Sequence, residues 1–255
     1  MEWRRAVHGE GEEIKENGNA PGHAPEVPSP RANSSACLIG NKVYLFGGHG
    51  GQQYQRIAFN DVWSFDCDTF EWKKVEPQNN PPEARGGHTA FSIDSKIFVY
   101  GGWNSENQFS NLLIFNTETE EWTDPDIYHE QPRWNHCAAM VEAIPSWKYF
   151  IFGGETGEFP EGGPRQFGGY INSTGVLDIE TMMWTSITTE DAVGLQKPFL
   201  PKAREYGAMI YDHKGSRLLV FGGWANEWMC DIHALNVSSI VGPSYAVTEI
   251  VPNLG

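Results

Sequence analysis

The sequence predicts an all-β fold built from a repeated four-stranded sheet. A glycine pair closes an apolar, β-rich run four times along the 255 residues, as VYLFGG, IFVYGG, YFIFGG and LLVFGG. The chain is also rich in glycine (28), proline (16) and aromatic residues (13%), while charged residues make up 20%. Such a composition favours many short strands joined by tight turns over long solvent-exposed helices.

Each glycine pair keeps its order relative to two further landmarks. The second glycines are separated by 54, 52 and 69 residues, and lie at Gly48, Gly102, Gly154 and Gly223. An arginine introduced by proline precedes each pair, at Arg31, Arg85, Arg133 and Arg204. A tryptophan follows three of the pairs, at Trp72, Trp122 and Trp184, and the degenerate fourth unit has Tyr245 near that place. This phase relationship indicates a repeat architecture.

Within the second unit the pattern predicts four strands in a meander. Strands are expected at 88–93, 96–100 and 112–116 and around Trp122, with polar turns at 94–95 and 118–119. The second strand is apolar throughout, which predicts burial on both of its faces, as for a strand between two neighbouring sheets.

The recurring glycines and tryptophans are interpreted as structural. Glycine adopts positive φ at little cost and lets two sheets approach closely where the backbone turns. Tryptophan is a large apolar plate that suits the wedge between sheets that splay apart. The structural residues are Gly47, Gly48, Gly101, Gly102, Gly153, Gly154, Gly222, Gly223, Trp72, Trp122 and Trp184.

The glycine pair, the later tryptophan, the period near 50 and the segment Asn60-Asp61-Val62 together resemble the kelch repeat over residues 31–250. The resemblance implies a β-propeller with one four-stranded blade per unit and a protein that binds other proteins. The predicted units are 31–80, 81–128, 129–190 and 201–250.

The two ends of the chain suggest how the propeller begins and ends. Residues 2–5 (EWRR) resemble 71–74 (EWKK), which predicts that 1–7 form an orphan outer strand of a closing blade. Residues 8–30 are expected to be a flexible Gly/Glu/Pro-rich connector, and 251–255 a tail or the start of a further domain. Because kelch propellers commonly contain about five to seven blades, four units predict a fragment of a larger propeller or an unusual closure.

Charge and composition restrict the partners and the compartment. A net charge of −15 disfavours nucleic acid and anionic membranes as partners. No signal peptide and no stretch of about 18 apolar residues occurs, so a cytoplasmic protein is expected, with cytoskeletal association as a refinement. Oligomeric state is left open. Four free thiols are expected, at Cys37, Cys67, Cys137 and Cys230.

The predicted protein-binding face is the rim that carries the long connections between second and third strands and between successive blades. Aromatic and arginine side chains, the types that dominate interface hot spots, gather in these loops. The candidate residues are Arg56, Trp103, Phe109, Phe159, Arg165, Phe167, Trp224 and Trp228. An alternative for Trp103 and Trp224, which directly follow glycine pairs, is that they cap the core of the blade.

No enzyme, cofactor or metal site is predicted. The pairs Arg85-x-x-His88 and Arg133-x-x-His136 recur in repeat phase, which favours local hydrogen bonding over catalysis. The predicted function is a scaffold, adaptor or complex subunit. Two alternatives stay open: a structural subunit of a large cytoskeletal or ciliary assembly, and a metal-dependent kelch enzyme of the galactose-oxidase or nitrile-specifier type.

Overall fold

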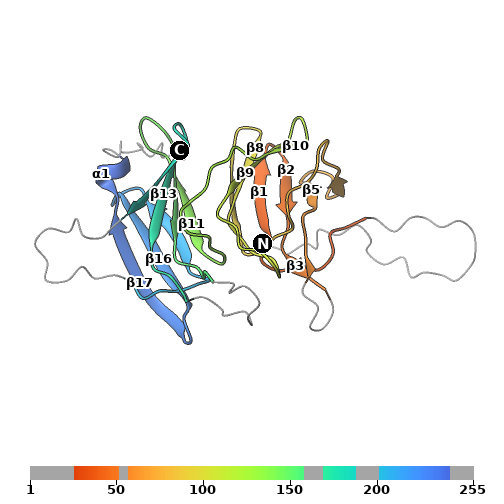
Figure 1. Cartoon of the computed structure of the whole chain (residues 1–255). Coiled ribbons are helices and arrows are strands. Elements are labelled where there is room, and N and C mark those ends of the chain that lie inside the picture. The colour runs from red at the N-terminus through yellow and green to blue at the C-terminus, as the bar shows by residue number, and fades with distance from the viewer. Residues whose placement is uncertain (1–25, 52–56, 158–168, 188–200, 242–255) are drawn as a thin grey trace, which may run out of the picture. The chain divides into compact units, whose positions relative to one another are not determined.

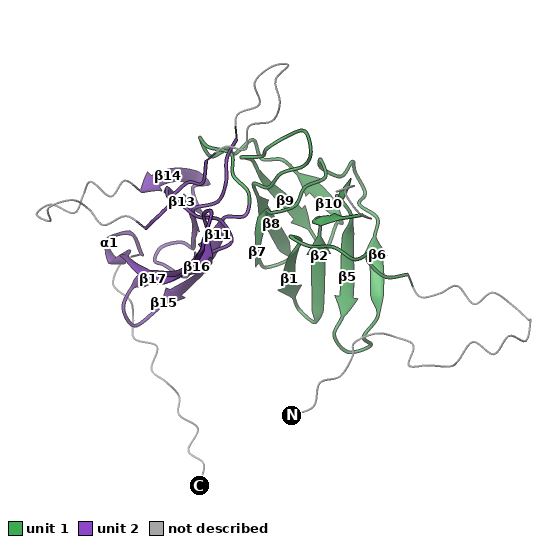
Figure 2. Cartoon of the chain, turned by 90° about the horizontal axis from the view of Figure 1, so that it is seen from below, with its two compact units in different colours: residues 1–134 green, residues 135–255 purple. Residues whose placement is uncertain are grey.

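A computed structural model describes residues 26–51, 57–157, 169–187 and 201–241 as a chain of antiparallel sheets (Figure 1). The chain divides into two compact units, residues 1–134 and 135–255 (Figure 2). Each unit contains the described strands of two of the predicted repeats. The expected outer strand at 1–7 and the 8–25 part of the connector lie outside the described residues, as does the tail at 251–255.

The first repeat forms a four-stranded sheet in the order β1-β2-β5-β6. Its strands are β1 (Ser35–Ile39), β2 (Lys42–Phe46), β5 (Val62–Asp66) and β6 (Trp72–Val75). A short hairpin, β3 (His49–Gly50) with β4 (Ile57–Ala58), lies between the second and third of these strands. Every pairing in the sheet is antiparallel, as expected of a meander.

The second repeat confirms the strands predicted from its sequence. They are β7 (Thr89–Ile93), β8 (Lys96–Tyr100), β9 (Leu112–Asn116) and β10 (Glu121–Thr123). Along β8 every residue after Lys96 is buried, which agrees with the predicted burial on both faces. The turn between β7 and β8 places Asp94 at a φ of 52°, a conformation that aspartate tolerates better than most residues.

The second unit holds repeats 3 and 4. Repeat 3 consists of β11 (Cys137–Val141), β12 (Lys148–Phe152), β13 (Thr174–Asp178) and β14 (Met183–Ile187). Repeat 4 has three described strands and a one-turn helix, which are β15 (Ala208–Asp212), β16 (Arg217–Trp224), β17 (Trp228–Asn236) and α1 (Ser238–Val241). Its expected fourth strand around Tyr245 lies outside the described residues.

Sheets of successive repeats pack face to face and form one apolar core in each unit. In unit 1 the core joins Phe46 and Val62 of repeat 1 to Val99 and Phe115 of repeat 2. The Trp122 ring completes it, with its centroid 4.8 Å from that of Phe46. The tryptophan therefore fills the wedge between two sheets, as its size suggested.

Unit 2 repeats this arrangement with equivalent residues. Phe152 and Val176 of repeat 3 share a core with Val220 and Leu218 of repeat 4. The opposite face of the repeat-4 sheet is apolar but exposed. The exposed fractions on that face are 62% for Ile210, 54% for Phe221 and 64% for Ile232.

The glycine pairs connect one repeat to the next through the backbone. Gly48, at a φ of 97°, donates its amide to the carbonyl oxygen of Arg85 at 2.8 Å. The same bond recurs from Gly102 to Arg133 (2.9 Å) and from Gly154 to Arg204 (2.8 Å). The glycine and arginine landmarks that keep phase in the sequence are thus hydrogen-bonded partners in the fold.

The four cysteines are free, and they differ in exposure. Cys37 and Cys137 are buried in the two cores, Cys67 is half-buried and Cys230 is exposed. Burial raises the pKa of the Cys37 thiol to about 11, so this side chain is a protonated, apolar packing residue at neutral pH.

Candidate protein-interaction surface

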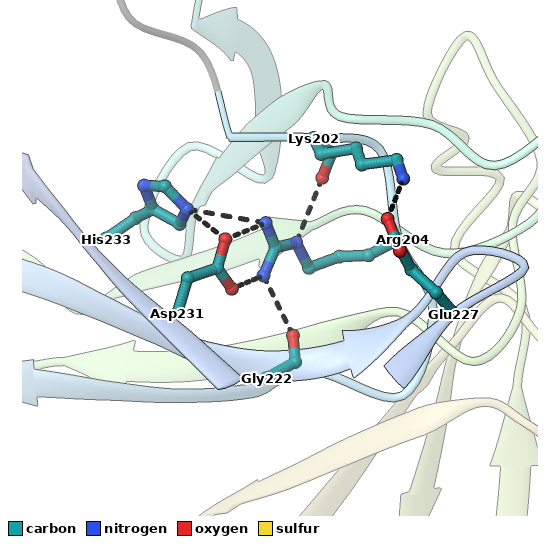
Figure 3. Close-up of polar contacts among 6 residues, drawn as sticks. All are labelled: Lys202, Arg204, Gly222, Glu227, Asp231 and His233. Carbon is teal, nitrogen blue, oxygen red and sulfur yellow. Dashed lines mark hydrogen bonds and ion pairs between the residues drawn. The ribbon is translucent and has the colours of Figure 1, made fainter. Parts of the chain in front are cut away.

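The side chains of Arg31, Arg85 and Arg204 donate hydrogen bonds to the carbonyl oxygens of the glycine pairs. In repeat 4 the Arg204 guanidinium is 1% exposed and donates to the carbonyl of Gly222 at 3.0 Å (Figure 3). It also forms a bidentate ion pair with the Asp231 carboxylate, at 2.5 and 2.9 Å. Hydrogen bonds from Arg204 hold the pKa of the Asp231 carboxyl well below its usual range. The ends of β16 and β17 are thereby fixed against each other.

Repeat 1 has the same arginine–aspartate pair, whereas repeat 2 has an uncharged hydrogen-bond partner in place of the aspartate. Arg31 pairs with Asp61 at 2.6 and 2.9 Å and donates to Gly47 at 3.1 Å. In repeat 2 the acidic partner is replaced by Asn111, whose amide oxygen accepts from Arg85 at 2.9 Å. The Phe109 ring covers this guanidinium, with its centroid 3.8 Å away.

The pairing of these side chains with the arginines was not predicted from the sequence, although Asp61 belongs to the Asn60-Asp61-Val62 segment that resembles the kelch repeat. Their signal is positional, because Asp61 and Asn111 stand directly before the third strands of their repeats, and Asp231 holds the same place relative to the following Ile232 within β17. A carboxylate in phase with a buried arginine is a recognisable pattern once both positions are aligned by the glycine pairs.

The arginine–histidine motif of repeat 2 is structural as well. His88 is buried, and its Nε2 lies 2.8 Å from the Ser35 hydroxyl of repeat 1. Burial, reinforced by the positive charge of Arg85, lowers the pKa of His88 to about 3. A neutral histidine bonded across the junction between two sheets serves packing rather than proton transfer.

Two of the candidate binding residues lie in the interior. Trp103 is 8% exposed and packs between His49 and Trp134, with centroids 5.1 and 6.0 Å away. Phe109 is 9% exposed beneath the Arg85 guanidinium. Both therefore cap the blade, the alternative considered for Trp103, and neither presents a ring to a partner. Four other candidates, Arg56, Phe159, Arg165 and Phe167, lie outside the described residues.

The remaining two candidates lie together on repeat 4. Trp224 and Trp228 face each other at the end of the β16–β17 hairpin, with ring centroids 4.8 Å apart. Trp228 is 79% exposed, whereas Trp224 is half-buried. Their three-residue connection is tight, with the Ala225 amide bonded to the Glu227 carbonyl at 3.1 Å. A large aromatic plate is thus presented to solvent on a constrained turn.

A shallow hollow of about 420 Å³ adjoins this turn, and its wall includes Tyr170, Lys202, Asn226 and Glu227. Lys202 and Glu227 form an ion pair across it, at 2.6 Å between Nζ and Oε1 (Figure 3). None of these four residues was singled out by sequence. We call the surface formed by Tyr170, Lys202, Trp224, Asn226, Glu227 and Trp228 the repeat-4 rim.

Among residues 26–51, 57–157, 169–187 and 201–241, no cluster of three or more His, Cys, Asp or Glu side chains could hold a metal ion. Within the same ranges, no helix has the length and apolar character needed to cross a membrane.

Repeated four-stranded sheets, glycine pairs at positive φ and arginines that bridge them define a β-propeller protein of the kelch-repeat class. The KLHDC2/KLHL20/DRC7 Kelch-repeats domain matches residues 15–197, and the chain belongs to this family. Members of such kelch families typically mediate protein interactions and are generally non-catalytic.

Several longer proteins are similar to this chain. The flagellar outer-arm dynein alpha chain of Chlamydomonas reinhardtii is 32% identical over 244 residues, which cover 90% of this chain and 5% of the dynein. Kelch domain-containing protein 3 of Bos taurus is 29% identical over 212 residues, 80% of this chain and 50% of that protein. Acyl-CoA-binding domain-containing protein 5 of Arabidopsis thaliana is 25% identical over 214 residues, 83% and 30% respectively. The chain spans half or less of these relatives.

Proposed function

We propose that this chain is a non-catalytic protein-binding module, a scaffold, adaptor or complex subunit, and that the repeat-4 rim is part of its binding face. The observation that carries the proposal is the 79% exposure of Trp228. An exposed tryptophan on a tight, hydrogen-bonded turn offers a large contact area at low entropic cost, which is the usual character of an interface hot spot.

The surroundings of Trp228 fit this role. Trp224 supports the exposed ring from one side, and the hollow beside the turn can receive a side chain of the partner. The Lys202–Glu227 pair supplies a charged margin at the edge of the apolar centre. Apolar centres with polar rims are typical of protein interfaces.

Affinity capture with paired variants tests the proposal. We expect Trp228→Ala to lose partners that the wild-type chain retains, with a further loss for Trp224→Ala combined with Trp228→Ala. Met183→Ala is the matched control, because Met183 is a large side chain of the same unit, 66% exposed, that lies on β14 away from the rim hairpin. If the Trp228→Ala variant retained every partner, the repeat-4 rim would not be part of the binding face.

A second function, a structural subunit of a cytoskeletal or ciliary assembly, is favoured by one observation. The match to the flagellar dynein alpha chain extends over 90% of this chain at 32% identity. A net charge of −15 makes direct electrostatic binding to an acidic filament unfavourable, so the partner would be another protein of the assembly.

Co-sedimentation separates the two functions. In the cytoskeletal case the chain should sediment with isolated axonemes, and Trp228→Ala should weaken that association. Purified microtubules without accessory proteins should leave it in the supernatant. If the chain sediments with neither preparation and captures non-cytoskeletal partners, a role in a cytoskeletal or ciliary assembly would be excluded. The adaptor function would then be the remaining proposal.

A further inference from the structure

Repeat 3 departs from the other repeats at the turn between its first two strands. The connecting residues are 40–41 in repeat 1, 94–95 in repeat 2 and 213–216 in repeat 4. In repeat 3 the longer segment 142–147 connects β11 to β12, and we call it the repeat-3 turn. Because two residues suffice to join antiparallel strands, the sheet itself does not require the additional length.

One backbone hydrogen bond shows which residue of this turn is in register with the other repeats. In each repeat, the amide directly after the third strand donates to the carbonyl of the residue directly before the second strand. The acceptors in repeats 1, 2 and 4 are Asn41, Ser95 and Ser216, at 3.0, 2.9 and 2.9 Å. In repeat 3 the Ile179 amide donates to the carbonyl of Trp147 at 3.0 Å. A tryptophan therefore takes the place of small polar residues.

Buried and exposed side chains alternate along the repeat-3 turn. Ala143 is buried in the core of unit 2, and Ser146 is buried as well. Ile144 is 65% exposed, Pro145 is exposed, and Trp147 is 41% exposed. The turn is thus anchored at two points while it presents an isoleucine and a tryptophan to solvent.

A polar network beneath the turn fixes its conformation. The Ser146 hydroxyl donates to Asp178 Oδ1 at 2.9 Å, and Lys148 Nζ donates to Ser146 Oγ at 3.0 Å. Lys148 also forms an ion pair with Asp178. The amides of Glu180 and Thr181 donate to the same carboxylate, at 2.9 and 3.1 Å. The repeat-3 turn is therefore joined to the turn after β13, and a partner would meet side chains that lose little conformational entropy on binding.

The exposed charged side chains beside Ile144 and Trp147 are acidic. Glu142 begins the repeat-3 turn, Glu180 lies in the turn after β13, and both are exposed. Neither 142–147 nor 179–182 contains a lysine or an arginine. The neighbouring positive charge, that of a buried lysine at the start of β12, is already paired within the polar network. An acidic partner segment would be repelled here, whereas a basic one would be attracted.

We propose that the repeat-3 turn is a second protein-binding surface, on which Ile144 and Trp147 contact an apolar side chain of the partner. The partner segment carries lysine or arginine residues beside that side chain, and these pair with Glu142 and Glu180. The turn lies at the end of β12 that is opposite its glycine pair, whereas the repeat-4 rim adjoins a glycine pair. Binding at one surface therefore does not depend on the other.

Titration with synthetic peptides, followed by NMR of the tryptophan indole N–H groups, tests the proposal. The probe KKLFKK has an apolar centre between basic residues, EELFEE reverses the charge, and KKSSKK removes the apolar centre. The indole signal of Trp147, identified by its loss in Trp147→Phe, should shift with KKLFKK and stay in place with the other two. Glu142→Lys combined with Glu180→Lys should reverse the preference between KKLFKK and EELFEE. Trp228→Ala, which alters only the repeat-4 rim, should keep the shift.

Stability measurements distinguish binding from a role in folding. Ile144→Ser should leave Tm within about 2 °C of the wild type, and Trp147→Ser should lower it by less than about 5 °C, because both side chains are largely exposed. A greater loss for Trp147→Ser would show that the ring stabilises the fold and would overturn the proposal. So would the absence of a Trp147 shift with KKLFKK, or an equal shift with all three peptides.

Discussion

The amide of Gly48 donates to the carbonyl oxygen of Arg85 at 2.8 Å, while the guanidinium of the same arginine donates to the carbonyl of Gly101 at 3.2 Å. One residue therefore ties the glycine turn of repeat 1 to the glycine turn of repeat 2. The glycine pairs and the arginines that recur in the sequence are therefore joined to one another by hydrogen bonds from one repeat to the next.

Substitution of the second glycine of a pair should destabilise the glycine turn, because the added Cβ has no room. A Cβ on Gly102 would lie 2.9 Å from the His88 Cβ, and its φ of 97° is strained for any L side chain. We expect Gly102→Ala to lower the free energy of unfolding by about 2–4 kcal/mol in urea titrations. Gly40→Ala is the control, since its φ is also positive, at 58°, but nothing lies within 4 Å of its Cβ. Equal losses in the two variants would show that the close approach of Gly102 to His88 is unimportant for stability.

Removal of the acidic partner of Arg204 should cost more than removal of a surface ion pair. Asp231→Ala leaves a guanidinium that is 1% exposed without its carboxylate. Because Asp231 itself is 44% exposed, we expect a loss of about 2–3 kcal/mol, below the range for a fully buried pair. Glu227→Ala, which removes the exposed partner of Lys202 in the same region, should leave the unfolding midpoint unchanged. Similar midpoints for the two variants would contradict the role given to Arg204.

Stability should fall as the pH is lowered through the range in which histidine normally titrates. The folded pKa of His88 is about 3, below the ordinary histidine value of 6.5, so between these pH values the unfolded chain binds the additional proton. Folding stability from this group is therefore complete above about pH 6.5 and is lost as pH decreases, by about 2 kcal/mol at pH 5. Urea titrations at pH 7 and pH 5 should show a smaller difference for His88→Gln than for the wild type. An unchanged difference would mean that His88 is not buried as a neutral side chain.

The sequence predicted the blades well because each depends on local pattern. The β7–β10 sheet has the predicted strands, with an end that moves only from His88 to Thr89. An apolar run bounded by a polar turn and a glycine pair leaves little freedom in the register of a meander.

The exposure of individual loop residues could not be predicted in the same way. Phe109 belongs to a connection between strands, yet it folds back beneath the guanidinium of Arg85. The sequence contains no local signal for this contact, because the two residues are brought together by the glycine turn between them. Trp228 is exposed for the opposite reason, since its turn is too short to fold back over the end of the sheet.

The number of blades also lies beyond the local pattern. Ile210, Phe221 and Ile232 occupy positions whose counterparts Cys37, Phe46 and Val62 are buried against the next repeat. A face of this kind is consistent with a larger propeller. Whether a neighbouring blade covers it depends on contacts between segments distant in sequence, which repeat counting does not address.

Site-specific photo-crosslinking from the rim is the most direct test of the proposed binding function. A photoreactive phenylalanine analogue placed at position 228 should form a covalent product with a partner protein in cells that express the chain. The same analogue at position 183, also exposed in unit 2, should not form that product. A crosslinked partner at position 228 that disappears with Trp224→Ala would agree with an interface centred on the repeat-4 rim. Identical products from positions 228 and 183, or none at 228 while the chain is in its complex, would contradict it.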